Sequence, residues 1–401
     1  MAGMVIIGAG HAAGHAAASL RQEKYTGSIT LIGDEEHVPY QRPPLSKQYL
    51  AGEQGIERVY LRPEKFYADK DVELRLKTRA TAIDREAKSV SLDDGSVVAY
   101  DKLLLATGSR PRTLDIPGTD LAGIFYLRTI ADVDAIKGAM APGKKLVIVG
   151  GGYIGLEVAA VSQELGLEVH VLEMEERILQ RVTTPEMSDY YHSLHASRGV
   201  HMHTSTTVTG FSGDGKVAHV ECGETQFDAD LVIIGIGIIP NTELADETGL
   251  EIDNGIVVDE SCRTSDSNIF AAGDCTNHPN LRLNRRLRLE SVPNAVEQAR
   301  VCASTMLGGD KTYASIPWFW SDQYELKLQM VGFSTDGDEQ ILRGDMASNN
   351  FAMFYLKDGA VVAVDAVNSP KEFMVCKQLI GKQVDRAILE DADSDLKTLL
   401  S

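Results

Sequence analysis

Apolar runs that end in glycine recur along the chain and predict buried strands that lead into helices. The first run, residues 4–7, reads Met-Val-Ile-Ile and enters Gly8. A segment rich in alanine follows, and residues 28–32 form a second apolar run. Unbroken apolar runs of this kind are typical of parallel strands that are covered on both faces. The N-terminal stretch therefore predicts a β-α-β unit.

Small residues at the first strand–helix junction have the spacing of a dinucleotide-binding turn. Gly8 would permit the tight turn, Gly10 the close approach of a pyrophosphate, and Ala13 close packing of helix on strand. The pyrophosphate would lie on the free N–H groups of the helix. Asp34 ends the next strand, where an acid accepts ribose hydroxyls. By itself the pattern is equally compatible with an ordinary strand–helix turn.

A second copy of the same pattern makes two dinucleotide sites the better interpretation. Residues 146–149 form an apolar strand that enters Gly150, Gly152 and Gly155. The next predicted strand ends at Glu173, the second ribose acid. Residues 103–108 and 231–235 are also matching strands of two similar units, which indicates a duplicated domain.

Other segments predict elements of known local chemistry. Thr129 and Asp132 can form a capping box for a helix to about residue 140. Residues 89–92 and 97–100 predict a hairpin, and Ser291 precedes a helix to about residue 306. After residue 317 the pattern changes to a hairpin around residues 357–359 and one helix, which predicts a separate β-β-α unit without a nucleotide signature.

Composition and charge restrict the class of protein. A length of 401 residues suggests two or three domains, and a net charge of −19 argues against general nucleic-acid binding. We expect no transmembrane helix, and the N-terminus enters a strand without a signal-like segment, so a cytoplasmic protein is expected. None of the five cysteines forms a Cys-x-x-Cys pair, and no Cys/His cluster has zinc or iron–sulfur spacing. We therefore predict neither a redox dithiol nor metal ligands.

Two further stretches carry candidate chemistry. The loop of residues 39–47 contains two prolines, Arg42 and Lys47, and Ser46 is expected to cap a following helix. The loop is either a rigid, solvated surface or a cofactor contact. An apolar strand at residues 269–272 ends in Gly273 and Asp274, which would aim a carboxylate at a ligand hydroxyl; an ordinary turn aspartate is the alternative.

The assembled motifs resemble the FAD-dependent ferredoxin reductases of bacterial oxygenase systems, in the glutathione reductase structural superfamily. The resemblance covers essentially the whole chain. It rests on the Gly8/Gly10 turn and on strings at residues 42–47, 150–157, 273–275, 290–295 and 318–323. It implies an α/β fold with two Rossmann-like domains and a C-terminal α+β domain. The FAD domain would be split (1–110 and 241–316) around an NADH domain (111–240), with the third domain at 317–401.

The resemblance also implies site residues. Lys47 and Glu157 would be catalytic, with the lysine near the flavin and the carboxylate holding it; Glu157 as a mere helix-start residue is the alternative. The expected FAD contacts are Gly8, Gly10, Ala12, Ala13, Asp34, Arg42, Lys47, Ala80, Arg128, Asp274, Val292 and Trp320. The expected NADH contacts are Gly150, Gly152, Tyr153, Ile154, Gly155, Glu157, Glu173 and Gly237.

The implied reaction is hydride transfer from NADH to FAD, then single-electron transfer to a [2Fe-2S] ferredoxin that supplies a cytochrome P450 or other oxygenase. Glu173 and two acidic neighbours would repel the 2′-phosphate of NADPH, whereas Arg177 would favour it.

Four arginines after Asp274 form either a docking patch for an acidic ferredoxin or a solvated face; they are Arg282, Arg285, Arg286 and Arg288. Trp318 and Trp320 are either flavin-rim or core residues.

Other functions on the same scaffold stay open. Rubredoxin reductase and monodehydroascorbate reductase are alternatives with single-electron chemistry. NADH oxidases, peroxidases and coenzyme A disulfide reductases carry a redox cysteine in the loop where this chain has Ser46 and Lys47. A flavin-binding signalling protein of the apoptosis-inducing-factor type would turn over slowly and form a long-lived reduced complex.

Overall fold

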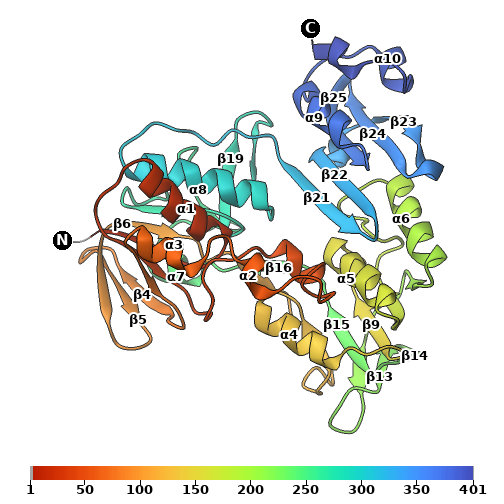
Figure 1. The fold of residues 1–401 in the computed structure, drawn as a ribbon, viewed down its shortest axis with the longest axis horizontal. Helices are drawn as coiled ribbons and strands as arrows, with labels where there is room; N and C mark the ends of the chain where they lie inside the picture. The colour runs from red at the N-terminus through yellow and green to blue at the C-terminus, as the bar shows by residue number, and fades with distance from the viewer. Residues whose placement is uncertain (1–2, 401) are drawn as a thin grey trace. The chain divides into compact units, whose positions relative to one another are not determined.

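The computed structural model describes residues 3–400, which fall into two compact units. Unit 1 contains the chain up to Arg42, Gln54–Arg110 and Ile238–Pro317. Unit 2 contains Pro43–Glu53, Pro111–Gly237 and the chain from Trp318 onward. Figure 1 follows the chain through both by colour. Each unit is thus built from segments that lie far apart in the sequence.

Unit 1 is centred on a mixed sheet in the order β3-β2-β1-β6-β5-β4, with β18 also paired to β6. Pairing is parallel from β3 through β6 and β18, and antiparallel between β6, β5 and β4. Strand β6 is long enough to pair in both ways. These strands are β1 (Gly3–Ile7), β2 (Ile29–Ile32), β3 (Val72–Arg75), β4 (Ala80–Asp84), β5 (Ser89–Leu92), β6 (Val97–Leu105) and β18 (Ile269–Ala271).

Two helices, α1 (His11–Gln22) and α8 (Val292–Met306), pack against each other in unit 1 (Figure 1). Their alanine-rich faces share one core with alternate residues of the sheet, such as Ile6 and Leu104. Small side chains let the helices approach closely, which positions the start of each beside the sheet's carboxyl edge. The other elements here are α2 (Ile56–Val59), α3 (Glu64–Asp69), α7 (Glu243–Glu247), β17 (Ile256–Val257), β19 (Thr276–Asn280) and β20 (Arg285–Leu287). Strands β7 (Ser109–Pro111) and β16 (Ile238–Pro240) lie where the chain passes between units.

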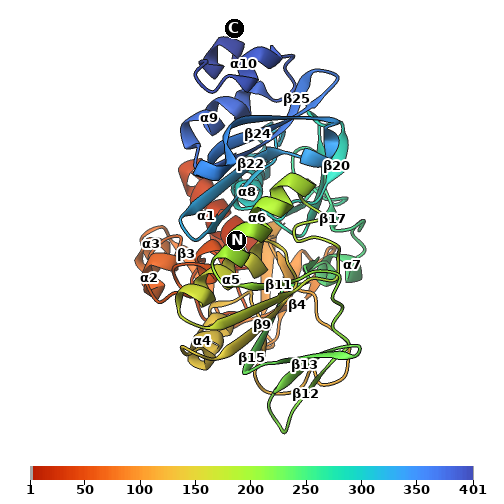
Figure 2. The ribbon, with the colours of Figure 1, turned by 90° about the vertical axis from the view of Figure 1, so that its right-hand side faces the viewer.

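Unit 2 contains a second parallel sheet, in the order β11-β10-β9-β15-β8. Its central strands are apolar and fully buried, as in the first sheet. Figure 2 shows this sheet with the smaller antiparallel β12-β13-β14 sheet below it. The strands are β8 (Ile124–Tyr126), β9 (Lys145–Val149), β10 (Glu168–Leu172), β11 (His201–His203), β15 (Leu231–Ile234), β12 (Gly210–Ser212), β13 (His219–Cys222) and β14 (Thr225–Asp228). The helices are α4 (Ile130–Ala139), α5 (Tyr153–Glu164) and α6 (Pro185–Ser197).

The C-terminal part of unit 2 is an antiparallel sheet in the order β21-β22-β25-β24-β23. Its inner face shares a core with α5 and α6, in which Leu156 and Tyr191 meet Leu328 and Phe351. The strands are β21 (Trp318–Gln323), β22 (Leu326–Gly332), β23 (Glu339–Asp345), β24 (Asn350–Lys357) and β25 (Ala360–Val367). The helices are α9 (Pro370–Leu379) and α10 (Arg386–Glu390), and the 3₁₀ turns of the unit are Pro43–Ser46, Ser334–Asp336, Met346–Ser348 and Leu396–Leu400.

The structure confirms most predicted elements and corrects two. The two strand–glycine–helix units, the capping box at Thr129 and the helix after Ser291 are confirmed. The predicted strands at residues 97–100 and 103–108 form one strand, β6, which ends at Leu105 and changes partner along its length. The predicted C-terminal β-β-α unit is wrong: the hairpin is right, but three further strands complete the sheet.

Candidate active site

The first glycine-rich turn of unit 1 has the geometry that a dinucleotide pyrophosphate requires. Gly8 has φ +117°, and a Cβ there would lie 2.1 Å from the carbonyl oxygen of Ala106. A Cβ at Gly10 would meet no other atom within 4 Å, so the backbone is open to a ligand. Gly10 is the N-cap of α1, with no side-chain cap and no acid in the first turn. The N–H groups at this helix start are therefore available to an anionic ligand.

The second turn, in unit 2, repeats this geometry closely. Gly150 has φ +110°, and a Cβ would lie 2.4 Å from the carbonyl oxygen of Gly235. A Cβ at Gly155 would lie 2.3 Å from the Gly150 oxygen, so only glycine allows α5 to pack this tightly. Gly152 is open on its Cβ side and caps α5 without a side-chain bond. By contrast, Thr129 caps α4 with its hydroxyl. The residues present fit two dinucleotides, one per unit.

The first turn of unit 1 meets the segments that were predicted to bind the same cofactor. A Cβ at Gly273 would lie 3.4 Å from the Cβ of Ala12, so this turn lies against the start of α1. The Gln298 side chain accepts a hydrogen bond from the Gly273 N–H at 2.7 Å. Asp274 accepts one from the Ser109 hydroxyl at 2.8 Å. Val292 is the first residue of α8, whose Ala295 also faces Gly273.

The adenosine end of this predicted site is polar and open. Asp34 follows β2, and its exposed carboxylate lies 3.1 Å from the guanidinium of Arg79. Ala80, the next residue, is buried at the start of β4. Arg42 lies in unit 1 with its guanidinium 3.0 Å from Glu35. Three other predicted FAD contacts, Lys47, Arg128 and Trp320, belong to unit 2.

Glu173 supports the second glycine-rich turn directly. One carboxylate oxygen accepts a hydrogen bond from the Gly151 N–H at 2.7 Å, and the other accepts from the Glu175 N–H at 2.9 Å. Arg177, which would favour a 2′-phosphate, instead forms hydrogen bonds to residues of its own loop and of α6. It donates to the carbonyl oxygens of Thr183 and Gln180 and to the Ser188 hydroxyl. This arrangement supports NADH over NADPH.

The catalytic pair predicted from the sequence is a buried ion pair within unit 2. Lys47 Nζ lies 2.6 Å from Glu157 Oε2, and the two side chains are 10% and 4% exposed. Ser46 donates to the same oxygen at 2.5 Å, so the expectation that Ser46 caps a helix is wrong. Ser321, on β21, donates to Oε1 at 2.7 Å. Burying a carboxylate is costly unless it is paired and hydrogen-bonded, and Glu157 satisfies both conditions.

A chain of hydrogen bonds extends from Ser321 into the protein. Gln323 Nε2 donates to the Ser321 hydroxyl at 3.2 Å, and His195 Nε2 lies 2.8 Å from Gln323 Oε1. Because this amide oxygen only accepts, His195 carries its proton on Nε2 and Nδ1 accepts from the Tyr324 hydroxyl, 3.2 Å away. Burial lowers the pKa of His195 to about 4, so the ring is neutral at physiological pH. Each donor in this series of hydrogen bonds points toward Glu157.

Other predicted NADH contacts lie around the second turn. Ile154 is apolar yet 44% exposed, immediately after the open turn. Tyr153 instead points into the core, where its hydroxyl lies 2.9 Å from the sulfur of Met330, and burial raises its pKa well above the usual value. Gly237 has φ +104° and lies near the guanidinium of Arg181.

The surroundings of the two tryptophans and of the four predicted patch arginines differ from residue to residue. Trp318 packs on α9, with its ring 6.1 Å from that of Phe373, and both Trp318 and Trp320 are half-buried. The four predicted patch arginines lie on or beside the β19–β20 hairpin. Arg286 donates to the carbonyl oxygens of Val258 and Asn277, and Arg288 pairs with Glu290 at 2.5 Å. Arg286 and Arg288 are thus held within the fold.

The cysteines do not form a redox site in the described part of the chain. All five are free thiols, and four are buried. Burial raises the pKa of the Cys376 thiol to about 12 and raises those of Cys222, Cys275 and Cys302. Thiols of this kind are poor nucleophiles at neutral pH. Cys222, Cys275, Cys302 and Cys376 therefore give no support to the disulfide-reductase alternative.

Sequence reasoning missed the groups that complete the Glu157 site. Ser46, Ser321, Gln323 and His195 were not predicted as site residues. The sequence at residues 318–323 is part of the family resemblance, but only its tryptophans carry an expected role there. A serine and a glutamine two positions apart on one strand face was the available signal.

Comparison with known proteins agrees with this geometry. Residues 3–299 match the family model described as "Pyridine nucleotide-disulphide oxidoreductase", and residues 318–400 match "Reductase C-terminal". The chain therefore belongs to the pyridine nucleotide-disulphide oxidoreductase family. It is similar to putidaredoxin reductase of Pseudomonas putida (44% identity; 99% of this chain, 96% of the relative) and to rhodocoxin reductase of Rhodococcus erythropolis (43%; 99% and 94%).

Solved structures give the same result. The crystal structure of the covalent putidaredoxin reductase–putidaredoxin complex matches with a TM-score of 0.96 at 43% identity, covering 100% of this chain and 98% of the other. A ferredoxin reductase for the CYP199A2 system of Rhodopseudomonas palustris matches with 0.95 at 40%, covering 99% and 100%. The expected fold class is thereby confirmed. Among residues 3–400 there is also no helix with the length and apolar character needed to cross a membrane.

Proposed function

We propose that this chain is an NADH:ferredoxin oxidoreductase that binds FAD and serves an oxygenase system. The observation that carries the proposal is the buried Lys47–Glu157 pair, one turn into the helix that follows the second dinucleotide turn. A relative of similar length is named for reducing putidaredoxin, and a similar chain was crystallised in complex with it. The partner inferred for this chain is accordingly a small [2Fe-2S] ferredoxin.

FAD, when bound, supplies the chemistry that accepts a hydride and releases electrons one at a time. The chain's own residues bind and orient it. The bare start of α1 would hold its pyrophosphate at Gly10, and Asp34 its adenosine ribose. Asp274, fixed by Ser109, would accept a hydrogen bond from a cofactor hydroxyl. Arg42, Ala80, Arg128, Val292 and Trp320 are proposed as further contacts.

NADH is proposed to bind at the second turn. Gly150 and Gly152 leave the start of α5 open for its pyrophosphate. Glu173 would accept the ribose hydroxyls while it holds the Gly151 N–H. The exposed side chain of Ile154 offers an apolar contact to the same ligand.

Lys47 and Glu157 are proposed as the residues that act on the reacting rings. The carboxylate accepts from three donors and so fixes the direction of the Lys47 ammonium. A fixed cation stabilises negative charge that develops next to it without having to reorganise. Glu157 is also proposed to accept a hydrogen bond from the nicotinamide amide.

We assign docking of the ferredoxin to the tip of the β19–β20 hairpin. Arg282 and Arg285 are exposed there, and Leu281 is an apolar side chain that is 62% exposed. An exposed apolar residue with two arginines close to it in the sequence suits an acidic partner surface. We further propose the division into FAD, NADH and C-terminal domains given above, and a cytoplasmic location.

The test is anaerobic reduction of putidaredoxin, as the probe ferredoxin, by NADH and the purified flavoprotein. NADPH in place of NADH and oxygen in place of the ferredoxin serve as controls. We expect fast ferredoxin reduction with NADH, slow reduction with NADPH and little peroxide. Rapid oxygen consumption without reduction of putidaredoxin or of any other small [2Fe-2S] ferredoxin would overturn the proposal and indicate an oxidase.

A further inference from the structure

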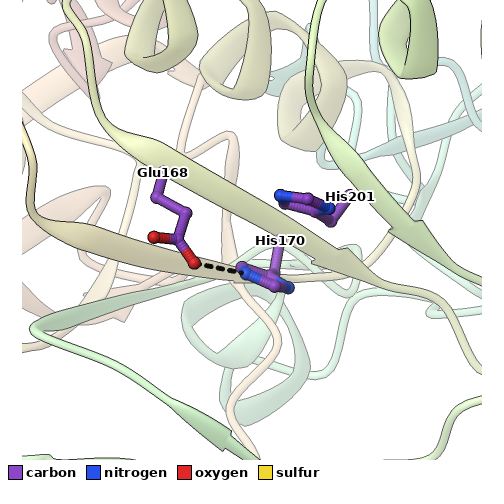
Figure 3. Close-up of side chains that lie close together, drawn as sticks. All are labelled: Glu168, His170 and His201. Atoms are coloured by element: carbon purple, nitrogen blue, oxygen red, sulfur yellow. Dashed lines mark hydrogen bonds and ion pairs between the residues drawn. The ribbon is translucent and has the colours of Figure 1, made fainter.

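Three potential metal ligands project from two neighbouring strands at the edge of the unit 2 sheet. Glu168 and His170 are two positions apart on β10, so their side chains share one face. His201, on the edge strand β11, is the register partner of His170. Figure 3 shows the three side chains grouped over the adjacent strands. Glu173 follows the carboxyl end of the same strand, three residues after His170.

The spacing of the donor atoms suits a divalent ion. Glu168 Oε1 lies 3.2 Å from His170 Nε2, and the His170 and His201 rings stack with centroids 4.5 Å apart. One donor atom from each residue lies within 4.8 Å of the others. Two metal–ligand bonds of about 2.1 Å at an angle near 100° would separate their donors by about 3.2 Å. An ion could therefore take the place of the proton between Glu168 and His170, and His201 would coordinate it once its ring turns out of the stack.

A fourth residue, His203, contacts His170 on the side away from Glu168. His203 Nε2 lies 3.1 Å from His170 Nδ1, and the two rings stack with an interplanar angle of 6°. When His170 Nε2 binds a metal, its proton lies on Nδ1 and is donated to His203. An outer partner of this kind fixes the tautomer of a metal-binding histidine.

We propose that Glu168, His170 and His201 form a surface site for a divalent transition-metal ion of the zinc type. Imidazole with one carboxylate suits Zn²⁺, Co²⁺, Ni²⁺ and Cu²⁺, whereas Mg²⁺ and Ca²⁺ prefer all-oxygen sites. Lys145, the register partner of Glu168 on β9, forms its ion pair with Asp228 at 2.7 Å. Water would complete the coordination, because Glu168 and His201 are exposed.

The bound ion would link the edge strand to the interior of the sheet. Strand β11 has three residues, each paired with β10. The carbonyl oxygen of His203 accepts the Glu173 N–H at 2.8 Å, so β11 also supports the loop that carries Glu173. A metal bridge from His170 to His201 would resist separation of these strands.

Calorimetric titration of the tag-free, FAD-loaded protein with ZnCl₂ tests the site. We expect one ion per chain, with at least tenfold weaker binding in both His170→Ala and His201→Ala. His219→Ala is the matched control, since His219 lies 3.2 Å from a carboxylate of Asp228 but belongs to no cluster of three potential ligands among residues 3–400. Flavin content and NADH oxidation should not change in any variant, which excludes misfolding as the cause.

Electron paramagnetic resonance of the Cu²⁺-loaded protein gives an independent measurement. The spectrum should show coupling to two imidazole nitrogens, and to one in His201→Ala. Zinc should raise the melting temperature of the unmodified protein but not of His201→Ala. Absence of binding, or binding that neither histidine variant weakens, would overturn the proposal.

Discussion

The ammonium of Lys47 lies 2.6 Å from the carboxylate of Glu157, and both side chains are buried. The two residues come from a 3₁₀ turn and a helix that are far apart in the sequence. Breaking such a pair leaves one buried charge without its partner, at a cost of about 3–5 kcal/mol. Replacing both charges at once can be almost neutral. Stability and catalysis can therefore be separated at this site.

We predict that Glu157→Gln and Lys47→Met each lower the melting temperature, and that the double variant recovers most of the loss. The rate of flavin reduction by NADH should instead stay about a hundredfold low in all three, because the oriented charge is gone. Urea unfolding and anaerobic stopped-flow absorbance measure the two effects. A double variant that recovers both would show that the pair is only structural.

Ser321→Ala should weaken the site through Glu157 without touching a ligand of either dinucleotide turn. A hydrogen bond to a charged group is worth about 1.5–3 kcal/mol, so flavin reduction should slow by about tenfold or more. Ser348→Ala, an exposed serine of the same C-terminal sheet region, is the control and should have no effect. The pH profile of flavin reduction should shift in Ser321→Ala alone; an unchanged profile together with an unchanged rate would remove Ser321 from a positioning role.

Coenzyme preference should depend on Glu173. Glu173→Gln keeps the shape of the side chain but weakens the bonds to the Gly151 N–H and to the ribose. We expect kcat/KM for NADH to fall about tenfold while NADPH remains a poor substrate, since Arg177 stays bonded to Thr183, Gln180 and Ser188. Steady-state kinetics with both coenzymes measure this. Efficient use of NADPH by this variant would contradict the role given to Arg177.

Ferredoxin reduction should weaken when charge is reversed at the hairpin tip. Arg282→Glu and Arg285→Glu should raise the KM for ferredoxin about tenfold at low salt and flatten its salt dependence. Lys216→Glu changes charge equally in a different exposed loop and is the control. Flavin reduction by NADH should be normal in all three. Equal effects of the three variants would remove the docking site from this hairpin.

Asp365 should make stability depend on pH. Burial raises the pKa of this carboxyl to about 6, although Tyr355 and Thr183 donate to it. Because the folded state holds this proton at higher pH than the unfolded state, the contribution of Asp365 is most favourable below about pH 4. This contribution to the free energy of unfolding falls by about 2–3 kcal/mol as the pH rises to about 6. The melting temperature of Asp365→Asn relative to the unmodified protein should rise over this range; a constant difference would contradict the assignment.

The periodic parts of this fold were predictable because local patterns determine them. The Gly8 and Gly150 turns have positive φ angles and tight backbone contacts that only glycine tolerates, so their spacing identifies them. Capping at Thr129 and Ser291 is likewise local. Lys47 and Glu157 came from the family resemblance, and the structure shows that they meet.

The features that could not be predicted from the sequence depend on contacts between segments that are distant in the chain. Ser321 reaches Glu157 only because β21 lies against α5, and no local pattern reports that contact. The Glu168–His170–His201 cluster has no metal-ligand spacing in the sequence because α6 separates its two strands in the chain. The number of C-terminal strands was underestimated because β21–β23 carry many polar residues on their outer faces.

The contribution of β21 to the Glu157 site limits how this protein can be recombined with its relatives. A chimaera that joins the nucleotide-binding part of one reductase to the C-terminal sheet of another must place a hydroxyl opposite the helix carboxylate. Exchange at residue 317 alone would also mix two halves of the core shared by α5, α6 and β22. Residues 43–53, 111–237 and 318–400 should therefore be transplanted together, as one inherited module that is discontinuous in the gene.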